Sequence, residues 1–235
     1  ADTGAQKIVV VLNDLYGNSS KDSIYLNVVD SKNPTYLKTP FTATLVGDSV
    51  TITQANILTN VTGGCYPAVV ALLDDLIFTC ANTSSNPNYV AFTVTNGNKT
   101  ILDSVAVTVA DATAPSLSLK TDTLILVGGS ANLTFANVAN TFADNCGIDS
   151  ATVNGASQVN FTCADTGSQQ VIVKLFDVNG NFKIDTVNVF VADTISPQYT
   201  KTPFTASLIT NSVAVSRANL FSNVSAGGFP PSLVF

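Results

Sequence analysis

The chain has 235 residues, of which 46% are hydrophobic and only 11% charged, and its formal net charge is −6 at pH 7. This acidic balance argues against nucleic acid and anionic membrane surfaces as partners, because both repel negative charge. The sequence contains no His and no Trp, and all 16 acidic residues are Asp. Without His, a Ser-His-Asp or Cys-His arrangement is excluded, and without Glu any catalytic carboxylate pair has to consist of two Asp. We therefore expect no enzyme.

The sequence repeats itself. Residues 1–72 recur 163 positions later as residues 164–235, and 30 of the 72 aligned pairs are identical. A shorter offset is also visible, since Pro34, Pro115 and Pro197 stand 81 and 82 positions apart, each shortly after an Asp. Repeats of this length are typical of tandem arrays in which each repeat is one folded unit. Because the longer offset gives the closer match, the repeating object is a pair of unlike units, which we call type A and type B.

The Pro-marked junctions divide the chain into four segments. Residues 1–33 are expected to be the C-terminal strands of a preceding type B unit, and residues 34–114 a whole type A unit. Residues 115–196 are expected to be a whole type B unit, and residues 197–235 the N-terminal strands of a following type A unit. Further repeats of the same long chain are then the expected neighbours, joined by linkers in which Pro limits bending.

Short alternating runs indicate strands throughout. The last strand of each unit is expected at residues 24–28, 105–109 and 187–191. In type B the earlier strands are expected, in chain order, at residues 116–126, 131–135, 148–153, 158–163 and 169–176, and the closing strand extends over 182–191. Short strands separated by turns, in units of roughly 80 residues, are typical of an immunoglobulin-like sandwich. The sequence thus predicts an all-β fold, with tandem immunoglobulin-like β-sandwich domains in an elongated array.

The cysteines fall in pairs. Cys65 and Cys80 lie in type A, Cys146 and Cys163 lie in type B, and the two members of each pair are near one another in the sequence. One pair per unit predicts an intradomain disulfide that closes a short loop, worth roughly 3 kcal/mol. Zinc is the competing interpretation, but two Cys with no His cannot complete a tetrahedral site. The predicted disulfides indicate an oxidising compartment outside the cytoplasm.

Three motifs of type B carry a family resemblance. They are Asp144-Asn145-Cys146-Gly147, then Phe161-Thr162-Cys163-Ala164-Asp165-Thr166-Gly167, and then Asp177-Val178-Asn179-Gly180-Asn181. With these motifs the chain resembles the hyalin-type (HYR-like) repeat, and more narrowly the version in giant surface proteins of Bacteroidetes, including SprB-type gliding adhesins. The resemblance covers type B throughout and type A more loosely, where the first motif has become Gly63-Gly64-Cys65-Tyr66. It implies a cell-surface adhesin that serves in attachment or gliding.

The third motif is also a candidate cation loop, because oxygen-bearing side chains alternate around a Gly as they do in loops that bind hard cations. The candidate calcium ligands are Asp177, Asn179 and Asn181, with Asp111 and Asp193 contributed by the linkers. In the copy at residues 14–18, Tyr16 replaces the middle ligand. A hairpin turn that uses Asn-Gly is the alternative interpretation. Calcium is thus the candidate cofactor, and no other cofactor is expected.

A further pattern is the triplet of Asp, Ser or Thr, and an aliphatic residue. Seven of the 16 Asp begin such a triplet, whereas this composition would give roughly two by chance. The triplet resembles the O-glycosylation sequon of Bacteroidetes, so O-linked glycans are expected partners. The alternative is a turn Asp before the start of a strand, which recurs because the fold recurs. The candidate O-glycosylation sites are Ser23, Ser49, Ser104, Thr123, Ser150, Thr186 and Thr194.

The predicted function is architectural. We expect a stalk or fibre segment of a long secreted adhesin at the cell surface, without catalysis. No run approaches the roughly 18–20 apolar residues that a membrane-spanning helix needs. One alternative is a self-assembling extracellular filament subunit, whose chains associate laterally or exchange strands. A second is an accessory carbohydrate-binding module of a secreted enzyme, which requires an exposed aromatic strip on one sheet face.

Overall fold

The computed structural model describes residues 3–97, 99–208, 211–225 and 232. Parts of the predicted terminal segments 1–33 and 197–235 therefore lie outside the described residues. The chain divides into two compact units, Ala1–Ala112 and Thr113–Phe235, and each is described by itself.

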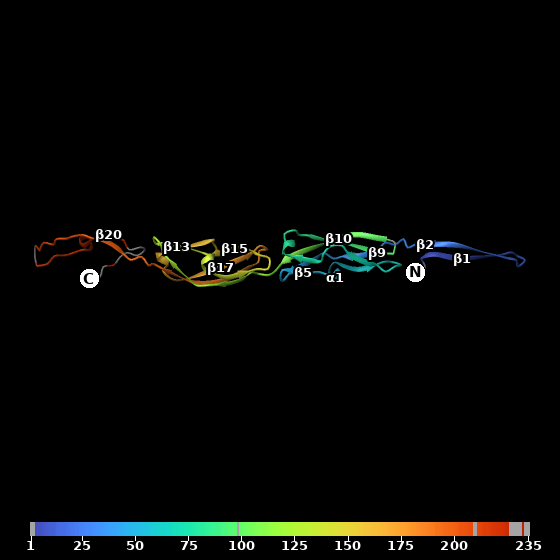
Figure 1. The fold of residues 1–235 in the computed structure, drawn as a ribbon, viewed down its shortest axis with the longest axis horizontal. Coiled ribbons are helices and arrows are strands. Elements are labelled where there is room, and N and C mark those ends of the chain that lie inside the picture. The colour runs from blue at the N-terminus through green and yellow to red at the C-terminus, as the bar shows by residue number, and fades with distance from the viewer. Residues whose placement is uncertain (1–2, 98, 209–210, 226–231, 233–235) are drawn as a thin grey trace. The chain divides into compact units, whose positions relative to one another are not determined.

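Unit 1 contains a separate hairpin and a sandwich. Its strands are β1 (Gly4–Asn13), β2 (Ser19–Val28), β3 (Thr35–Lys38), β4 (Phe41–Leu45), β5 (Ser49–Thr51), β6 (Leu58–Thr62), β7 (Val69–Leu72), β8 (Ile77–Thr79), β9 (Asn88–Asn96) and β10 (Lys99–Asp111), with helical turns α1 (Gln54–Ile57) and η1 (Cys80–Asn82). One sheet has the order β4-β10-β9-β7, and the facing layer consists of the pairs β3–β6 and β5–β8. Among the described residues, strands β1 and β2 pair only with each other (Figure 1).

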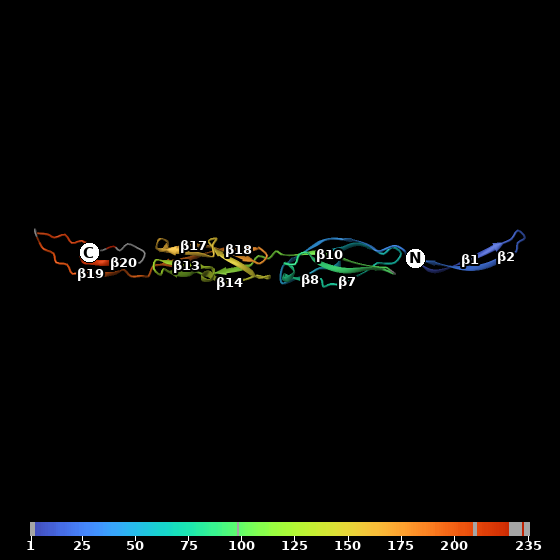
Figure 2. The ribbon, with the colours of Figure 1, turned by 90° about the horizontal axis from the view of Figure 1, so that it is seen from above.

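Unit 2 repeats this architecture. Its strands are β11 (Ser116–Leu119), β12 (Asp122–Ile125), β13 (Ser130–Thr134), β14 (Ala139–Ala143), β15 (Ile148–Val153), β16 (Gln158–Thr162), β17 (Gly167–Asp177), β18 (Phe182–Ala192), β19 (Gln198–Lys201) and β20 (Phe221–Ser225), with helical turns α2 (Phe135–Val138), η2 (Cys163–Asp165) and α3 (Arg217–Leu220). One sheet has the order β12-β18-β17-β15, and β11–β14 and β13–β16 form the other layer. Figure 2 shows β17 and β18 in one layer and β13 and β14 in the other. The prediction of all-β, immunoglobulin-like sandwich domains is confirmed.

The first strand of unit 2 differs from its prediction. The expected continuous strand 116–126 is interrupted at Lys120 and Thr121. Before the break, β11 pairs with β14 in one layer, and after it β12 pairs in parallel with β18 in the other. The chain therefore changes sheets within the stretch that was predicted as one strand, at the polar residues Lys120 and Thr121.

In each sandwich a one-turn α-helix, α1 or α2, follows a strand. In unit 2, the backbone N–H and the hydroxyl of Thr134 both donate to the side-chain oxygen of Asn137, each at 2.9 Å. Thr53 and Asn56 make the same pair of bonds in unit 1, at 2.7 and 2.9 Å. This reciprocal capping ends β13 at Thr134 and begins α2, where the sequence predicts that the strand continues. Within the described residues, no helix is long and apolar enough to cross a bilayer.

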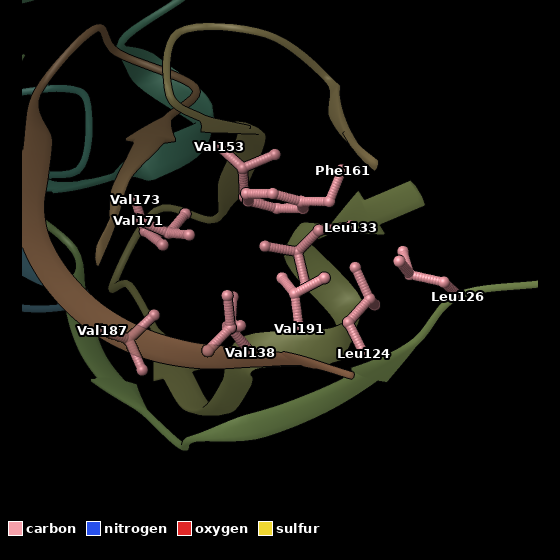
Figure 3. Packing of buried hydrophobic residues seen from close by; sticks show 11 residues of the cluster. Leu124, Leu126, Leu133, Val138, Val153, Phe161, Val171, Val173, Val187 and Val191 are labelled. Atoms are coloured by element: carbon pink, nitrogen blue, oxygen red, sulfur yellow. The ribbon is translucent and has the colours of Figure 1, made fainter. Parts of the chain in front are cut away.

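The core of unit 2 is apolar. Figure 3 shows side chains from both layers pointing into it, the Phe161 ring among them. The buried cluster comprises Leu124, Leu126, Leu133, Val138, Val153, Phe161, Val171, Val173, Val187, Val189 and Val191. Along β17, Val171 and Val173 are fully buried whereas Ile172 between them is 51% exposed, as the alternation of side chains in a strand requires. Burial of each such side chain contributes roughly 1.5–3 kcal/mol.

Strands that are related by the 163-residue offset pair in the same register. The register of β1 against β2 runs from Gly4↔Val28 to Asn13↔Ser19, and that of β17 against β18 includes the equivalent pairs, beginning with Gly167↔Val191. The burial differs, however. Ile8 and Val10 are 44% and 52% exposed, whereas their equivalents Val171 and Val173 are 0% exposed. The hairpin β1–β2 thus presents, to solvent, a face that is the core face of its copy.

Candidate functional site

The predicted cation loop is the turn between β17 and β18. Asp177 is the last residue of β17 and is 2% exposed. Its Oδ1 accepts hydrogen bonds from the backbone N–H groups of Asn179 and Asn181, at 2.9 and 2.8 Å. Its Oδ2 accepts from the side-chain amide of Asn181 at 2.8 Å. The carboxylate therefore faces into its own turn and holds that turn closed.

The copy of this turn at residues 14–18 makes the same bonds. Asp14 Oδ1 accepts from the backbone N–H groups of Tyr16 and Asn18 at 2.9 and 2.8 Å, and Oδ2 accepts from the Asn18 amide at 2.7 Å. These bonds, the Asn18 side-chain bond first, lower the pKa of Asp14 below its ordinary value. The middle residue is Tyr in one copy and Asn in the other, so its side chain is not needed. The geometry supports the hairpin-turn interpretation of the motif.

The predicted calcium ligands do not converge within unit 2. Asn179 serves the turn through its backbone, and the Asn181 amide nitrogen points at Asp177. Asp193 follows the far end of β18, and eleven residues of strand span about 35 Å. There Asp193 Oδ1 accepts from the backbone N–H of Ile195 at 3.0 Å. The hairpin residues and Asp193 therefore lie too far apart to bind the same cation.

Asp111 lies in a strand and not in the predicted linker. It is the last residue of β10, where it pairs with Leu45 of β4, and it is 9% exposed. The sequence predicts that Asp111 belongs to the linker between two units. The strand continues to this residue because the parallel partner β4 extends the sheet up to Leu45.

One carboxylate that the sequence analysis did not select lies beside Asp177. Oxygens of Asp144 and Asp177 lie within 4.8 Å of each other. Asp144 Oδ2 accepts from the backbone N–H groups of Cys146 and Gly147 at 2.8 and 3.1 Å. Its Oδ1 is buried and has no hydrogen-bond partner among the described residues. The available signal was the Asp-Asn-Cys-Gly motif itself, but nothing in the sequence pairs it with a residue 33 positions later.

The predicted disulfides are wrong. Cys65 is an exposed free thiol and Cys163 a half-buried one, whereas Cys80 and Cys146 are disulfide-bonded. Neither the pair Cys65–Cys80 nor the pair Cys146–Cys163 is therefore formed.

The strands between the cysteines explain why. In unit 2 the turn that contains Cys146 lies against the β17–β18 hairpin, where Val178 N–H donates to Gly147 O at 3.2 Å. Cys163 begins η2, which leads directly into Gly167 at the other end of β17. An eleven-residue strand separates these ends by about 35 Å, and a disulfide needs Cα atoms within roughly 7 Å. The segment between Cys146 and Cys163 is thus not a short loop, because the chain runs the length of the sandwich.

The candidate glycosylation triplets lie mostly on the surface. The residues Ser23, Ser49, Thr123, Ser150, Thr186 and Thr194 are exposed, and Ser104 is half-buried. The Asp of four triplets lies inside a strand: Asp22 in β2, Asp103 in β10, Asp149 in β15 and Asp185 in β18. The alternative interpretation, a turn Asp before the start of a strand, is therefore wrong for these four.

The adjacent acidic pair Asp74-Asp75 lies in the segment between β7 and β8. Asp74 Oδ2 accepts a hydrogen bond from the backbone N–H of Ala91 at 2.7 Å. This Asp therefore has a structural partner in β9.

The two exposed aromatic side chains of β18 lie far from each other. Phe182 is 47% and Phe190 53% exposed, and eight residues along a strand separate them by about 27 Å. The ammonium group of Lys174 lies 3.8 Å from the Phe182 ring centroid, in cation–π contact. The ring face on which a sugar would stack is thus occupied, and these two rings do not form the strip that a carbohydrate-binding module needs.

No protein-family model and no curated protein matches this sequence. Among solved structures, the ICAM-5 D1–D4 ectodomain fragment has a TM-score of 0.37 at 15% identity, with 81% of this chain and 57% of that chain covered. The human desmocollin-1 ectodomain has a TM-score of 0.26 at 13% identity, covering 85% and 50%. An endo-fucoidan hydrolase from glycoside hydrolase family 107 has a TM-score of 0.27 at 14% identity, covering 83% and 35%. The chain thus spans between 35% and 57% of these three chains. TM-scores this low carry no argument about function.

Proposed function

We propose that this chain is a stalk segment of a long, non-catalytic surface adhesin, built from alternating type A and type B units. The observation that carries the proposal is the repeated register. Lys38↔Leu58 in β3–β6 returns as Lys201↔Phe221 in β19–β20, in addition to the repeat of the β1–β2 register in β17–β18. A chain that repeats its strand pairing at a fixed offset has the organisation of a tandem array.

The junction residues support a stalk with limited bending. Pro34 and Pro115 are buried, so the start of each whole unit is packed and its φ is fixed. Asp30 Oδ1 accepts from the backbone N–H of Lys32 at 2.9 Å, and Asp193 makes the equivalent bond to Ile195. These turns order the chain between the closing strand of one unit and the Pro of the next.

Surface location and reach are tested together on cells that produce the protein. We expect antibodies against residues 115–196 to label intact, unpermeabilised cells. An in-frame deletion of one A–B pair should preserve labelling and shorten the surface fibre by about 80 Å, since each unit is about as long as its eleven- to thirteen-residue strands. Labelling only after permeabilisation, or an unchanged fibre length, contradicts the proposal.

The surface triplets support O-linked glycans as part of this function. The hydroxyl-bearing residue is exposed in six of the seven triplets, as an enzyme that attaches a sugar requires. The test is intact mass and glycopeptide mapping of native material. Added hexose-containing mass at the exposed triplets supports the proposal, and unmodified Ser and Thr at all seven refutes it.

Calcium is proposed at a site that shares Asp177 with the hairpin loop and pairs it with Asp144. The supporting observation is the pair Asp144 and Asp177, since a buried carboxylate oxygen without a hydrogen-bond partner beside a second carboxylate is a donor set suited to a hard cation. Asp144 and Asp177 are the residues that would hold the ion, which would neutralise their charge at this end of unit 2.

A self-assembling filament is the second candidate, and the exposed face of β1–β2 favours it. Ile8 lies on the face that is buried in the copy, whereas Val9 corresponds to Ile172, which is 51% exposed even in unit 2. If chains assemble through this face, Ile8→Asp should reduce assembly in sedimentation velocity and Val9→Asp should not. Equal assembly of the two variants contradicts the filament.

A further inference from the structure

Strand β18 has a free edge over residues 182–188. On one side it pairs along its length with β17. On the other side β12 pairs only with the last four residues, from Asp122↔Val189 to Ile125↔Ala192. Within the described residues, the segment 182–188 therefore has a strand on one side only. An unpaired edge of this kind is a template for a strand from another chain.

The N–H of Thr186 points to this free edge. In β17 its opposite residue is Ile172, whose N–H donates to Asn154 Oδ1 and whose C=O accepts from Asn154 N–H, both at 2.8 Å. Ile172 thus directs its backbone groups away from β18. Directly opposite residues in an antiparallel pair either bond each other or both point outward. Thr186 therefore points outward, and its N–H donates to Asp185 Oδ1 at 2.8 Å.

The same arrangement recurs in unit 1. Ala91, opposite Ser104, directs its N–H to Asp74 and its C=O to Leu73 N–H, away from β10. The N–H of Ser104 donates to Asp103 Oδ1 at 2.8 Å, and β4 pairs only with residues 107–111 of β10.

In β2, Ser23 N–H donates to Asp22 Oδ1 at 2.7 Å, and in the part of the chain that the structure describes β2 pairs with β1 alone. Asp22, Asp103 and Asp185 are separated by the same offsets as the three junction prolines, so they occupy the same position in successive units.

We propose that Asp185, with its equivalents Asp22 and Asp103, is an edge guard whose carboxylate occupies the outward N–H of the next residue and so prevents a second copy of the chain from pairing with this edge. The guard is needed most in β18, where the neighbouring Phe182 and Ile184 are 47% and 49% exposed. Apolar side chains beside an open ladder favour edge-to-edge pairing.

The proposal gives the triplets of β2, β10 and β18 a structural cause. The Asp side chain is short enough to reach the next N–H. The following Ser or Thr faces outward, and the aliphatic residue faces the core, as Val187 does at 8% exposure. This requirement is independent of whether the hydroxyl carries a glycan.

The test uses the full chain with three substitutions. Asp185→Ala removes the acceptor, Asp185→Asn keeps a carbonyl oxygen in its place without the charge, and Asp48→Ala removes a carboxylate from an exposed position outside the strands. Each is measured by sedimentation velocity against the monomer mass of 24.4 kDa, and by hydrogen exchange of residues 182–188 at rising protein concentration. Circular dichroism and thermal unfolding check that all three remain folded.

We expect Asp185→Ala to shift toward twice the monomer mass at concentrations about tenfold lower than the wild type, with protection of residues 182–188 that grows with concentration. Asp185→Asn and Asp48→Ala should match the wild type. If Asp185→Ala shows no concentration-dependent protection, the guard does not exist. If Asp185→Asn associates like Asp185→Ala, or Asp48→Ala does so, occupation of the N–H is not the cause and the proposal fails.

Discussion

The hydroxyl of Tyr36 donates a 2.8 Å hydrogen bond to the carboxylate of Asp103, which lies far along the chain. Tyr36 belongs to β3 and Asp103 to β10, in opposite layers of unit 1. Lys38 adds an ion pair to the same carboxylate at 3.1 Å. The Tyr36 ring meets Phe92 of the core edge-on, with centroids 5.3 Å apart. Tyr36 thus joins the two layers beside the part of β10 that does not pair with β4.

Removal of that hydroxyl should weaken unit 1. We expect Tyr36→Phe to lower the free energy of unfolding by about 1 kcal/mol, because one hydrogen bond to a partly exposed carboxylate is lost while the ring packing stays. The matched control is Tyr89→Phe, whose ring is 65% exposed and whose change should be close to zero. Urea unfolding measures both, and an equal effect of the two contradicts the role of Tyr36.

The stabilisation of unit 1 by the Tyr36–Asp103 hydrogen bond should be lost at both low and high pH. The hydrogen bond from Tyr36, with those from Ser104 and Lys38, lowers the pKa of Asp103 below 3.8, so its contribution is present above that pH and lost as the pH falls through the lowered pKa. Burial, and then the bond to Asp103, raise the pKa of Tyr36 above 10.0, so its contribution is lost as the pH rises beyond 10. Thermal unfolding across pH 2–11 should show a difference between wild type and Tyr36→Phe that narrows at both ends. A difference independent of pH contradicts this coupling.

A cavity in the core of unit 2 should cost more than any surface change. Leu133 is 0% exposed and Ile172 is 51% exposed. We expect Leu133→Ala to lower the free energy of unfolding by about 3 kcal/mol through lost burial and the cavity left behind, and Ile172→Ala by less than about 0.5 kcal/mol. Denaturant unfolding compares the two variants. Similar losses at both positions contradict the assignment of the buried face.

Calcium should stabilise unit 2 through Asp144. We expect calcium at 100 times its Kd to add about 2.7 kcal/mol to the wild type, seen as a higher unfolding temperature than in chelator. Asp144→Asn should abolish the rise while it keeps an acceptor for the turn, and Asp48→Asn should leave the rise unchanged. A wild-type unfolding temperature that is the same in calcium and in chelator contradicts the proposed ion.

The thiols should react unequally with iodoacetamide under non-reducing conditions. We expect complete alkylation of exposed Cys65, slower alkylation of half-buried Cys163, and none of Cys80 and Cys146 before reduction. Cys65→Ser should leave the unfolding temperature unchanged because this thiol forms no bridge. A peptide that links Cys65 to Cys80, or Cys146 to Cys163, contradicts the structure.

Period-two patterns and turn residues were enough to predict the sandwich. Val171, Val173 and Leu175 alternate with polar or exposed residues, and both neighbouring turns contain Gly, so β17 was predictable apart from its exact ends. The change of sheets at Lys120 was not predicted, because residues 116–126 were interpreted as one strand across the polar stretch 120–123. Nor was the helical turn after Thr134, which depends on one side-chain oxygen, that of Asn137, accepting two hydrogen bonds.

Site residues were harder to predict because, in a sandwich, separation in the sequence does not indicate separation in space. Cys146 and Cys163 are close in sequence and lie at opposite ends of β17, whereas Asp144 and Asp177 are far apart in sequence and lie side by side. Strand direction decides both relationships, and it depends on pairing that no local pattern encodes. Asp185 differs from these residues, because its recurrence in successive units was visible in the sequence. The role we propose for it depends on the unpaired edge of β18, which only the strand register shows.

The parallel pairing of β12 with β18, and of β4 with β10, has a consequence for a chain under tension. In each sandwich these are an early strand and the last strand, and they run in the same direction side by side. A pull on the two ends of the unit therefore slides one strand along the other, so that the backbone hydrogen bonds between them are loaded together instead of being opened one at a time. Each sandwich should resist stretching best along the direction in which the chain enters and leaves it.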